Sequence, residues 1–400
     1  MKKIVNSELV TVIAIMFTGV LSISVLQPVL PLYLTSIGIA PAVLGLMFSV
    51  AMIGMVIGES SGGWIADRVG LKLPLGVGTF LCAPVVFSFI LTRNIPAIFL
   101  IFFIWGIVRA AIFGPGRGYI GNTAPLSKKA TFMAILATTL AVSRSLGALM
   151  SGFVADTWGY DWNFFISSGI ALLGGVAVVR GLRRIPLVKP RLPAALTAPT
   201  AGSVSPKLTY GYRPFAFQCT VAALNFLGIG TMTFLPLLAT QVVGVRATEV
   251  GILFTIGGLV NAVSLIPLGR LADRKGKRVL MILGLLVSAV SLAGLAFAKS
   301  FPWLIISVIT HSLGVAMFSP AAVALLSDIV PTQWQSTAIG IYGGCEDIGI
   351  IAGLALGGLV WSAWGPPSTF LIGTIAYGVG ATICFGFIRE KRLKKPSQMS

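Results

Sequence analysis

Two ten-residue stretches decide the fold of this chain: Gly63-Trp-Ile-Ala-Asp-Arg-Val-Gly-Leu-Lys72 and Gly269-Arg-Leu-Ala-Asp-Arg-Lys-Gly-Lys-Arg278. Each stretch ends a long apolar run and opens into another one. Each is therefore predicted to form a tight, charged turn between two membrane-length helices. Gly70 and Gly276 are predicted to adopt the positive φ that such a turn requires, because glycine alone reaches it without steric cost.

The two stretches lie 206 positions apart, and the same shift aligns most of one half of the chain with the other half. Identical residues meet without a gap at turns, at helix-packing glycines and at aromatic positions: Gly38/Gly244, Gly45/Gly251, Phe48/Phe254, Asp67/Asp273, Pro125/Pro331, Thr131/Thr337, Gly147/Gly353, Gly152/Gly358, Trp158/Trp364, Gly159/Gly365 and Phe164/Phe370. This pattern indicates a duplicated chain. Parallel internal repeats of this kind build two-bundle transporters.

The composition predicts a membrane protein. Hydrophobic residues make up 56% of the chain and charged residues only 10%, whereas soluble domains carry about 25% charged residues. About 20 apolar residues cross the hydrocarbon core as a helix. The apolar pattern predicts an all-α membrane protein whose two six-helix bundles contain twelve transmembrane helices: 9–36, 42–65, 73–92, 95–121, 130–155 and 163–180, then 214–241, 247–268, 279–298, 302–327, 336–361 and 368–388.

The chain is predicted to divide into an N-terminal bundle (1–180), a linker (181–213) and a C-terminal bundle with a basic tail (214–400). The linker holds five prolines among basic and small residues, which neither continue a helix nor bury a core. Prolines inside the predicted helices are expected to kink or locally open them: Pro28 and Pro31, Pro115, Pro236, Pro267 and Pro320.

The formal net charge of +18 reflects topology. If the two charged turns are cytoplasmic, 23 of the 29 Lys and Arg residues lie on the cytoplasmic side, as the positive-inside rule requires. Both termini are then cytoplasmic, and the basic residues contact anionic lipid instead of nucleic acid. The four cysteines lie in apolar stretches without metal-like spacing, so free thiols and no metal site are expected. The first apolar run is expected to be a retained helix and not a signal peptide. The absence of an Asn-x-Ser/Thr sequon and the short outer loops favour a multi-pass protein of a prokaryotic inner membrane.

Charged side chains inside the predicted helices carry the strongest functional signal. A charge in hydrocarbon costs roughly 2.5–3.5 kcal/mol on insertion scales, so one that is present usually faces a cavity or a partner. Under the 206-residue shift every such residue falls on an uncharged one, whereas Asp67 falls on Asp273. We therefore expect the turns to be shared machinery and the intramembrane charges to serve individual functions.

Glu346 and Asp347 are adjacent, and they lie about ten residues, or roughly 15 Å, into the predicted helix 336–361. Two neighbouring carboxylates are not both comfortably ionised there, so one is a candidate proton acceptor. Neighbouring residues on a helix point about 100° apart, so one carboxylate can face a cavity and the other an adjacent helix. The alternative is a structural pair that an arginine neutralises.

Further polar residues are candidates for the substrate cavity or for proton transfer. Arg144, in the middle of the helix 130–155, can bind an anionic group of a substrate or counter a carboxylate. Gln27, Asn225 and Asn261 are additional candidates for lining the cavity. His311 can relay protons because imidazole titrates near neutral pH. The alternative for His311 is a hydrogen-bonded residue within an apolar helix.

Glu59 and Arg117 are predicted to form a buried structural pair near the inner gate. Each lies eight residues before a cytoplasmic marker, Asp67 for the first and Pro125 for the second, so both are expected at a similar depth. A structural role is favoured over substrate binding for both.

Both charged stretches resemble the loop signature G-x-L-A-D-R-x-G-R-K of the major facilitator superfamily. The first stretch has Ile65 and Leu71 where leucine and a basic residue are usual, and the second matches throughout, with its last two basic residues in the order Lys-Arg. The resemblance implies that this loop latches a cytoplasmic gate, with Asp67 and Asp273 stabilising a helix N-terminus. The residues to which it assigns that role are Gly63, Asp67, Arg68, Gly70, Gly269, Asp273, Arg274 and Gly276.

One further feature resembles the drug/proton antiporter branch of that family, and another resembles the family as a whole. The stretch Gly147-Ala-Leu-Met-Ser-Gly152 is similar to its G-P-x-x-G-G motif, with Ala148 in place of proline and Ser151 in place of a glycine. Arg109 lies in the middle of the fourth helix, where many members carry a basic residue linked to proton coupling.

Together these features predict a proton-coupled secondary transporter that works by alternating access and exports amphipathic or drug-like small molecules. No nucleotide-binding loop or nucleophile constellation occurs in the sequence, so we expect no enzymatic activity, no cofactor and a proton gradient as the energy source. The expected partners are a small-molecule substrate and the lipid bilayer, without nucleic acid, and the chain is expected to be monomeric. The alternatives are uptake or exchange of small organic anions or sugars, and a membrane sensor or scaffold that transports nothing.

Overall fold

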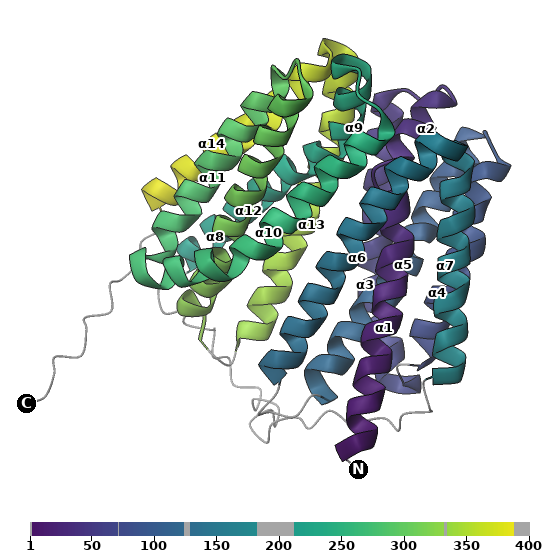
Figure 1. Cartoon of the computed structure of the whole chain (residues 1–400). Helices are drawn as coiled ribbons and strands as arrows, with labels where there is room; N and C mark the ends of the chain where they lie inside the picture. The colour runs from purple at the N-terminus through teal and green to yellow at the C-terminus, as the bar shows by residue number, and fades with distance from the viewer. Residues whose placement is uncertain (1, 71, 124–128, 182–211, 332–333, 388–400) are drawn as a thin grey trace, which may run out of the picture. The chain divides into compact units, whose positions relative to one another are not determined.

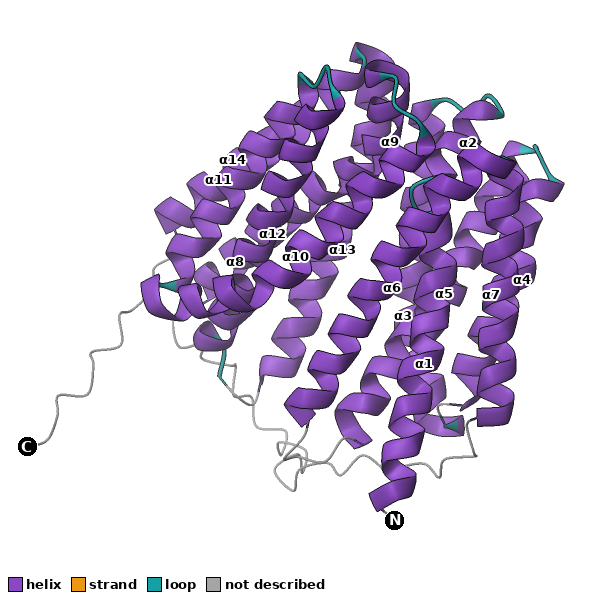
Figure 2. Ribbon diagram, viewed as in Figure 1, coloured by secondary structure: helices purple, strands orange, loops and turns teal. Residues whose placement is uncertain are grey.

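The computed structural model of this chain describes residues 2–70, 72–123, 129–181, 212–331 and 334–387. Within these ranges the chain is almost entirely helical and contains no strand (Figure 2). Twelve described segments are long and apolar enough to cross a membrane. Helices satisfy their backbone hydrogen bonds internally, which hydrocarbon requires because it offers no partners. The predicted fold class, an all-α protein with twelve membrane-crossing segments, is confirmed.

The helices of the two repeats follow one another in the same order (Figure 1). The described residues of the first repeat form α1 (Lys2–Leu26), α2 (Leu30–Ser36), α3 (Pro41–Val69), α4 (Lys72–Leu91), α5 (Ile95–Thr123), α6 (Lys129–Trp158) and α7 (Tyr160–Gly181). Those of the second form α8 (Tyr212–Thr231), α9 (Leu235–Leu237), α10 (Ala247–Lys275), α11 (Lys277–Ala296), α12 (Phe301–Ile329), α13 (Gln335–Trp364) and α14 (Pro366–Phe387).

The first crossing of each repeat is interrupted near a proline. A break at residues 27–29 separates α1 from α2, next to Pro28. In the second repeat a 3₁₀ turn (Met232–Phe234) precedes α9 and a π-helical segment (Leu238–Val243) follows it, next to Pro236. Proline removes a backbone donor and clashes with the preceding turn, so the predicted opening of these two helices is confirmed. By contrast, α5, α10 and α12 continue without interruption through Pro115, Pro267 and Pro320.

Three pairs of glycines show that the sequence repeat is also a repeat of backbone geometry. Positive φ angles occur only at glycines among the described residues: Gly38, Gly70, Gly159, Gly244, Gly276 and Gly365. The 206-residue shift places the first three of these glycines on the last three. A residue with a Cβ atom rarely adopts this conformation, so each pair marks the same turn in the two repeats.

The two charged stretches are mainly helical, which corrects the prediction that they are turns. α3 continues to Val69 and α10 to Lys275, beyond the predicted ends at 65 and 268. The change of direction is concentrated at Gly70 (φ 85°) and Gly276 (φ 104°), as expected for these two glycines. Charged residues are compatible with the last turns of a helix, and cations are favourable there; the glycine beyond them ends the helix.

The described residues pack into two compact units. The first unit contains the described parts of Met1–Ser203, Thr233–Leu259 and Leu354–Ala363; within it α3 packs on α5, α4 on α7 and α1 on α6 and α7. The second contains the described parts of Val204–Met232, Val260–Gly353 and Trp364–Ser400; within it α11 packs on α12 and α14, and α14 on α8. These units are not the two repeats, so the division of the chain at 181–213 stays a prediction.

We predict that Gly365→Ala destabilises the protein through its backbone alone. Gly365 has a φ of +86°, and a Cβ atom there would meet nothing within 4 Å. The expected cost is about 1–2 kcal/mol, because the left-handed region strains a residue that has a Cβ atom. Gly378→Ala is the matched control, since this glycine is helical and also faces open space; it should be neutral or slightly stabilising. Thermal unfolding in detergent measures both, and equal midpoints for the two variants would contradict the prediction.

Candidate functional site

The basic residue that ends each charged stretch binds the carboxyl end of another helix. Lys72 Nζ donates to the carbonyl oxygen of Val179 on α7 at 3.0 Å. The repeat-related Arg278 donates to the carbonyl oxygens of Phe385 and of Cys384, the latter at 3.3 Å, on α14. A cation stabilises the unpaired carbonyls and the partial negative charge at a helix C-terminus. The two repeats therefore share this contact.

An ion pair at the second charged stretch has no charged counterpart in the first repeat. Lys277 Nζ lies 2.5 Å from Asp328 Oδ2, at the end of α12. The 206-residue shift replaces this pair by Leu71 and Asn122, so both charges are absent together. The first repeat thus has Leu71 in place of the basic Lys277, and it also has the uncharged Asn122 in place of the carboxylate Asp328.

The structure places the predicted gate residues only in part. Asp273 and Arg274 are exposed in the last turns of α10, Arg68 is exposed in α3, and Gly269 is helical. The side chains of residues 63 and 67 lie outside the described ones. Asp273 does not cap the helix that follows it, since α11 begins after Gly276 without a side-chain cap. Latching of a gate by these residues stays a prediction.

Arg109 is a half-buried cation in the first unit. It lies on α5, and its guanidinium carbon is 4.5 Å from the centre of the Trp105 ring. Its Nε is buried without a hydrogen-bond partner among the described residues. The ring stabilises the cation through its π-face, and the partner Trp105 was not predicted from the sequence. The spacing of four residues on one helix was the available signal, because such residues share a face.

Two other predicted charges of the first unit are exposed. Arg144 lies on α6 and Glu59 on α3, and both act electrostatically on Arg109. The exposure of Glu59 corrects the prediction of a buried carboxylate at this position, because α3 presents it on its surface. The side chain of Arg117 lies outside the described residues, so pairing with Glu59 stays a prediction. The intramembrane charge of this unit is thus mainly cationic.

Glu346 and Asp347 lie half-buried on α13 in the second unit. Asp347 acts electrostatically on Glu346, as expected for adjacent carboxylates. Tyr342, one turn earlier on α13, is buried, and its hydroxyl has no hydrogen-bond partner among the described residues. All four cysteines are free thiols: Cys82, Cys219 and Cys384 are buried, and Cys345 is half-buried.

His311 is hydrogen-bonded within the second unit. Its Nε2 lies 3.0 Å from the hydroxyl of Tyr377, which joins α12 to α14. The Tyr377 ring covers Gly228 of α8, where a Cβ atom would overlap the ring. This arrangement matches the structural alternative for His311, a hydrogen-bonded residue in an apolar helix, and a role in proton transfer stays a prediction.

The three uncharged cavity candidates have different environments. Gln27 is exposed in the break between α1 and α2. Asn261 donates to the carbonyl oxygen of Ser312 at 3.4 Å. Asn225 is fully buried in α8, and both of its polar side-chain atoms lack a partner among the described residues. A buried amide without partners is costly, so Asn225 has the strongest physical case of the three for contact with a substrate or water.

Comparison with known proteins identifies similar chains along almost the whole length. The family model described as Major Facilitator Superfamily matches residues 12–238 and, a second time, 215–399. The multidrug resistance protein MdtG of Klebsiella pneumoniae (strain 342) is 25% identical over 372 residues, covering 91% of this chain and 89% of that protein. Multidrug resistance protein 1 of Bacillus subtilis (strain 168) is 23% identical over 388 residues, covering 95% and 96%.

The fold is also similar to that of a solved structure, a bacterial homolog of the human lysosomal transporter Spinster in an inward-facing and unoccupied conformation. The TM-score is 0.78 at 14% sequence identity, with 96% of this chain and 97% of the other covered. This similarity concerns the fold alone.

We predict that Tyr377→Phe lowers stability by about 1–3 kcal/mol, because His311 then keeps a buried ring nitrogen without a partner. Thermal unfolding in detergent measures the loss. Thr382→Val is the control on the same helix: this side chain is exposed and bonds only to the carbonyl of Gly378 in its own helix. If Tyr377→Phe unfolds at the same temperature as the control, the hydrogen bond contributes nothing.

Proposed function

Because the chain belongs to the Major Facilitator Superfamily, we propose that it exports amphipathic or drug-like molecules by proton-coupled alternating access. The protein is an integral multi-pass membrane transporter of small molecules and not an enzyme. An ion gradient supplies the energy in such carriers, without a cofactor. The two multidrug resistance proteins to which the chain is similar support export of drug-like compounds.

The adjacent carboxylates Glu346 and Asp347 carry the proposal of proton coupling. They lie within the apolar segment Thr337–Trp364, where an ionised group costs roughly 2.5–3.5 kcal/mol on insertion scales. Both are only half-buried, so protons can reach them. A carboxylate in this setting changes its protonation when its surroundings change between water and protein. That property couples proton uptake to a conformational cycle.

The unequal distribution of intramembrane charge supports a division of labour between the repeats. Arg109 and Arg144 belong to the first repeat, and the two carboxylates belong to the second. The 206-residue shift places none of them on a charged residue, whereas the positive-φ glycines keep the symmetry. We assign conformational change to the shared elements and coupling to the residues that differ.

The same proposal includes the topology. We propose that the protein lies in the inner membrane. The charged turns, the linker 181–213 and both termini are then on the cytoplasmic side, where the basic residues are concentrated. Residues 1–180 and 214–400 are then the two bundles that rock about a central site. We propose that the chain acts as a monomer without nucleic acid, and that Asp67, Arg68, Asp273 and Arg274 close the cytoplasmic gate.

Transport of small organic anions is a second candidate, which one observation favours. Arg109 lies over the Trp105 ring, and its buried Nε has no hydrogen-bond partner in the part of the chain that the structure describes. Arginine binds carboxylates and phosphates with two parallel hydrogen bonds, so an anionic substrate would satisfy this group.

We predict that Glu346→Gln together with Asp347→Asn strongly reduces substrate-driven proton movement. The reason is that amides of the same shape do not ionise, so they cannot take up and release a proton during the cycle. Purified protein in liposomes with an internal pH-sensitive dye receives lipophilic cations, sugars and organic anions in turn. We expect a dye response to lipophilic cations, reduced at least about tenfold in the double variant, which corresponds to about 1.4 kcal/mol.

Asp161→Asn is the matched control, because this carboxylate is exposed in the first turn of α7 and should leave the dye response unchanged. The two single variants then show which carboxylate exchanges the proton. Substrate-driven proton movement that persists in the double variant would overturn the assignment of coupling to α13. A wild-type protein that moves no compound of the panel would overturn the proposed export.

We predict that Arg144→Ala separates the two candidate functions. In the exporter of lipophilic compounds it weakens coupling and leaves substrate affinity nearly unchanged. In an anion transporter it weakens substrate binding by about 10–100-fold, because a charge-assisted hydrogen bond contributes roughly 1.5–3 kcal/mol. Binding of labelled compounds to the purified protein, measured without a proton gradient, distinguishes the two outcomes.

A further inference from the structure

Two backbone contacts in the first unit are copies of each other. A Cβ atom on Gly45 of α3 would overlap the carbonyl oxygen of Leu354 on α13. A Cβ atom on Gly251 of α10 would overlap the carbonyl oxygen of Ala148 on α6. Under the 206-residue shift Gly45 corresponds to Gly251 and Leu354 to Ala148, so the second contact is the repeat-related copy of the first. Each contact joins a helix of one repeat to a helix of the other, and all four segments belong to the first unit.

Next to each of these contacts, a side chain of one repeat accepts a hydrogen bond from the first turn of a helix of the other repeat. Ser362 Oγ on α13 accepts the backbone N–H of Ala42 on α3 at 3.0 Å. Asp156 on α6 accepts the N–H groups of Ala247 and Thr248 on α10, at 3.2 and 2.7 Å. Asp156 and Ser362 are related by the repeat, and so are Thr248 and Ala42. The first N–H groups of a helix have no partner within it, so an acceptor on another helix satisfies them.

The two contacts differ in strength because their acceptors differ in charge. Asp156 also accepts the Thr248 hydroxyl at 2.6 Å, so its carboxylate takes three hydrogen bonds, whereas Ser362 offers a neutral oxygen to one N–H group. A carboxylate at a helix N-terminus gains from the helix dipole as well, and its hydrogen bonds are stronger than neutral ones. The two contacts thus have related backbone geometry, but the contact at Asp156 is stronger than the contact at Ser362.

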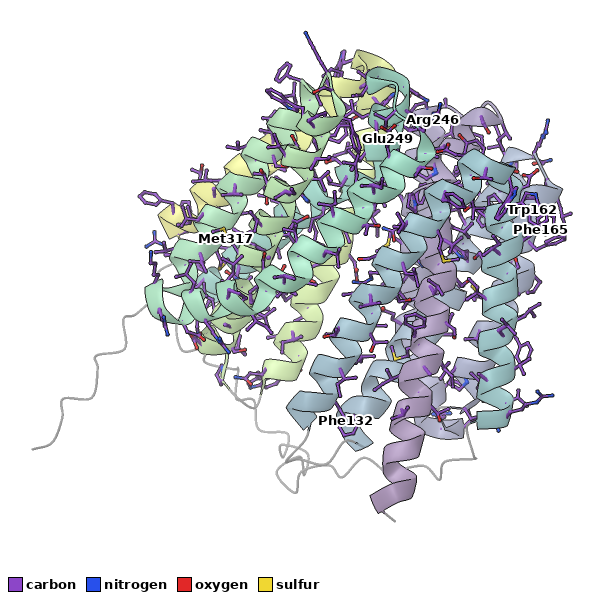
Figure 3. All side chains as sticks on the ribbon, in the orientation of Figure 1. Phe132, Trp162, Phe165, Arg246, Glu249 and Met317 are labelled. Carbon is purple, nitrogen blue, oxygen red and sulfur yellow. The ribbon has the colours of Figure 1, made fainter. Side chains whose placement is uncertain are left out.

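The surroundings of Asp156 are polar and accessible. Asp156 is exposed at the end of α6, and Tyr160 at the start of α7 is close enough to interact with it. On α10, Glu249 accepts the backbone N–H of Arg246 at 2.8 Å, so it caps the same helix locally (Figure 3). Glu249 leaves the N–H groups of residues 247 and 248 to Asp156.

We propose that Asp156 is a positioning residue whose carboxylate holds α6 of one repeat on the N-terminus of α10 of the other, and that this hold must be released and remade in each transport cycle. We name the contact of Asp156 with Ala247 and Thr248 the Asp156 latch. It lies at the N-terminal end of α10, and the charged stretch with Gly276 lies at the other end of the same helix. The release of the latch in each transport cycle rests on the proposed alternating access, whereas the hydrogen bonds that form the latch do not.

The test measures opening without any substrate. The four native cysteines are replaced by serine or alanine, and Ser145→Cys provides a nearly isosteric reporter on α6, buried on the turn side of the latch. A membrane-impermeant maleimide is added to intact cells and, separately, to inverted vesicles. We expect Asp156→Ala and Asp156→Ser to raise the labelling rate about tenfold from one side, because hydrogen bonds to a charged group contribute more than neutral ones. Thr248→Val, which removes one of the three bonds, should have a smaller effect.

Ser362→Ala is the matched control from the related position, and its labelling rate should stay within about twofold of the parent, since it loses one neutral hydrogen bond. The exchange Asp156→Ser with Ser362→Asp should restore protection, because the charged cap then holds the repeat-related helix instead. Labelling at the parent rate in all Asp156 variants, from both sides, would overturn the latch. If a variant fails to fold, Asp156→Asn supplies the same comparison with an acceptor oxygen retained.

Transport assays on the same variants separate this inference from the proposed function. If the latch is released and remade in each cycle, Ser362→Asp on the wild-type background slows turnover by strengthening the second contact, with substrate affinity unchanged. A changed labelling rate in a protein that transports nothing would support the latch and reject the proposed export. Normal transport with an unchanged labelling rate would support the proposed export and reject the latch.

Discussion

The structure depends on one constraint, the absence of hydrogen-bond partners for the backbone within hydrocarbon. The chain meets it with helices of membrane-spanning length, and it leaves helical geometry mainly where the sequence supplies proline or glycine. The interruptions beside Pro28 and Pro236 occupy corresponding regions of the two repeats. The positive-φ glycines reverse the chain at corresponding turns. Because every departure from the helix is costly, the two repeats depart from helical geometry in corresponding places.

Helix packing within the units follows from the same constraint. Lipid is as apolar as leucine, so helices associate through close backbone approach and polar contacts instead of the hydrophobic effect. Serines provide such contacts within each unit. Ser22 donates to the carbonyl oxygen of Ser167 at 2.9 Å in the first unit, and Ser291 donates to that of Ser307 at 2.6 Å in the second. Small side chains allow both the approach and the hydrogen bond.

Charge is used in two ways in this chain. At the ends of helices it stabilises backbone groups that have no partner in their own helix, as Lys72 and Arg278 do for carbonyls and Asp156 does for N–H groups. Inside the spans it is confined to a few residues that break the repeat, including Arg109 and Glu346. Of the helix-end charges, Lys72 and Arg278 keep the symmetry of the repeat and Asp156 keeps only the geometry of its contact, whereas the intramembrane charges have no charged counterpart at all. This contrast is the physical basis for separating conformational machinery from coupling.

The sequence by itself determined the membrane class, the twelve crossings, the duplication, the breaks near Pro28 and Pro236 and the positive φ at Gly70 and Gly276. These features depend on local apolar length and on backbone sterics, which a chain carries wherever it folds. It misplaced the ends of α3 and α10, because charged residues in a last turn look like a loop. Only the tertiary structure decided that His311 binds Tyr377 and that Asp156 binds Thr248. These partners lie 66 and 92 positions apart, and only the packing of helices determines which distant residues meet.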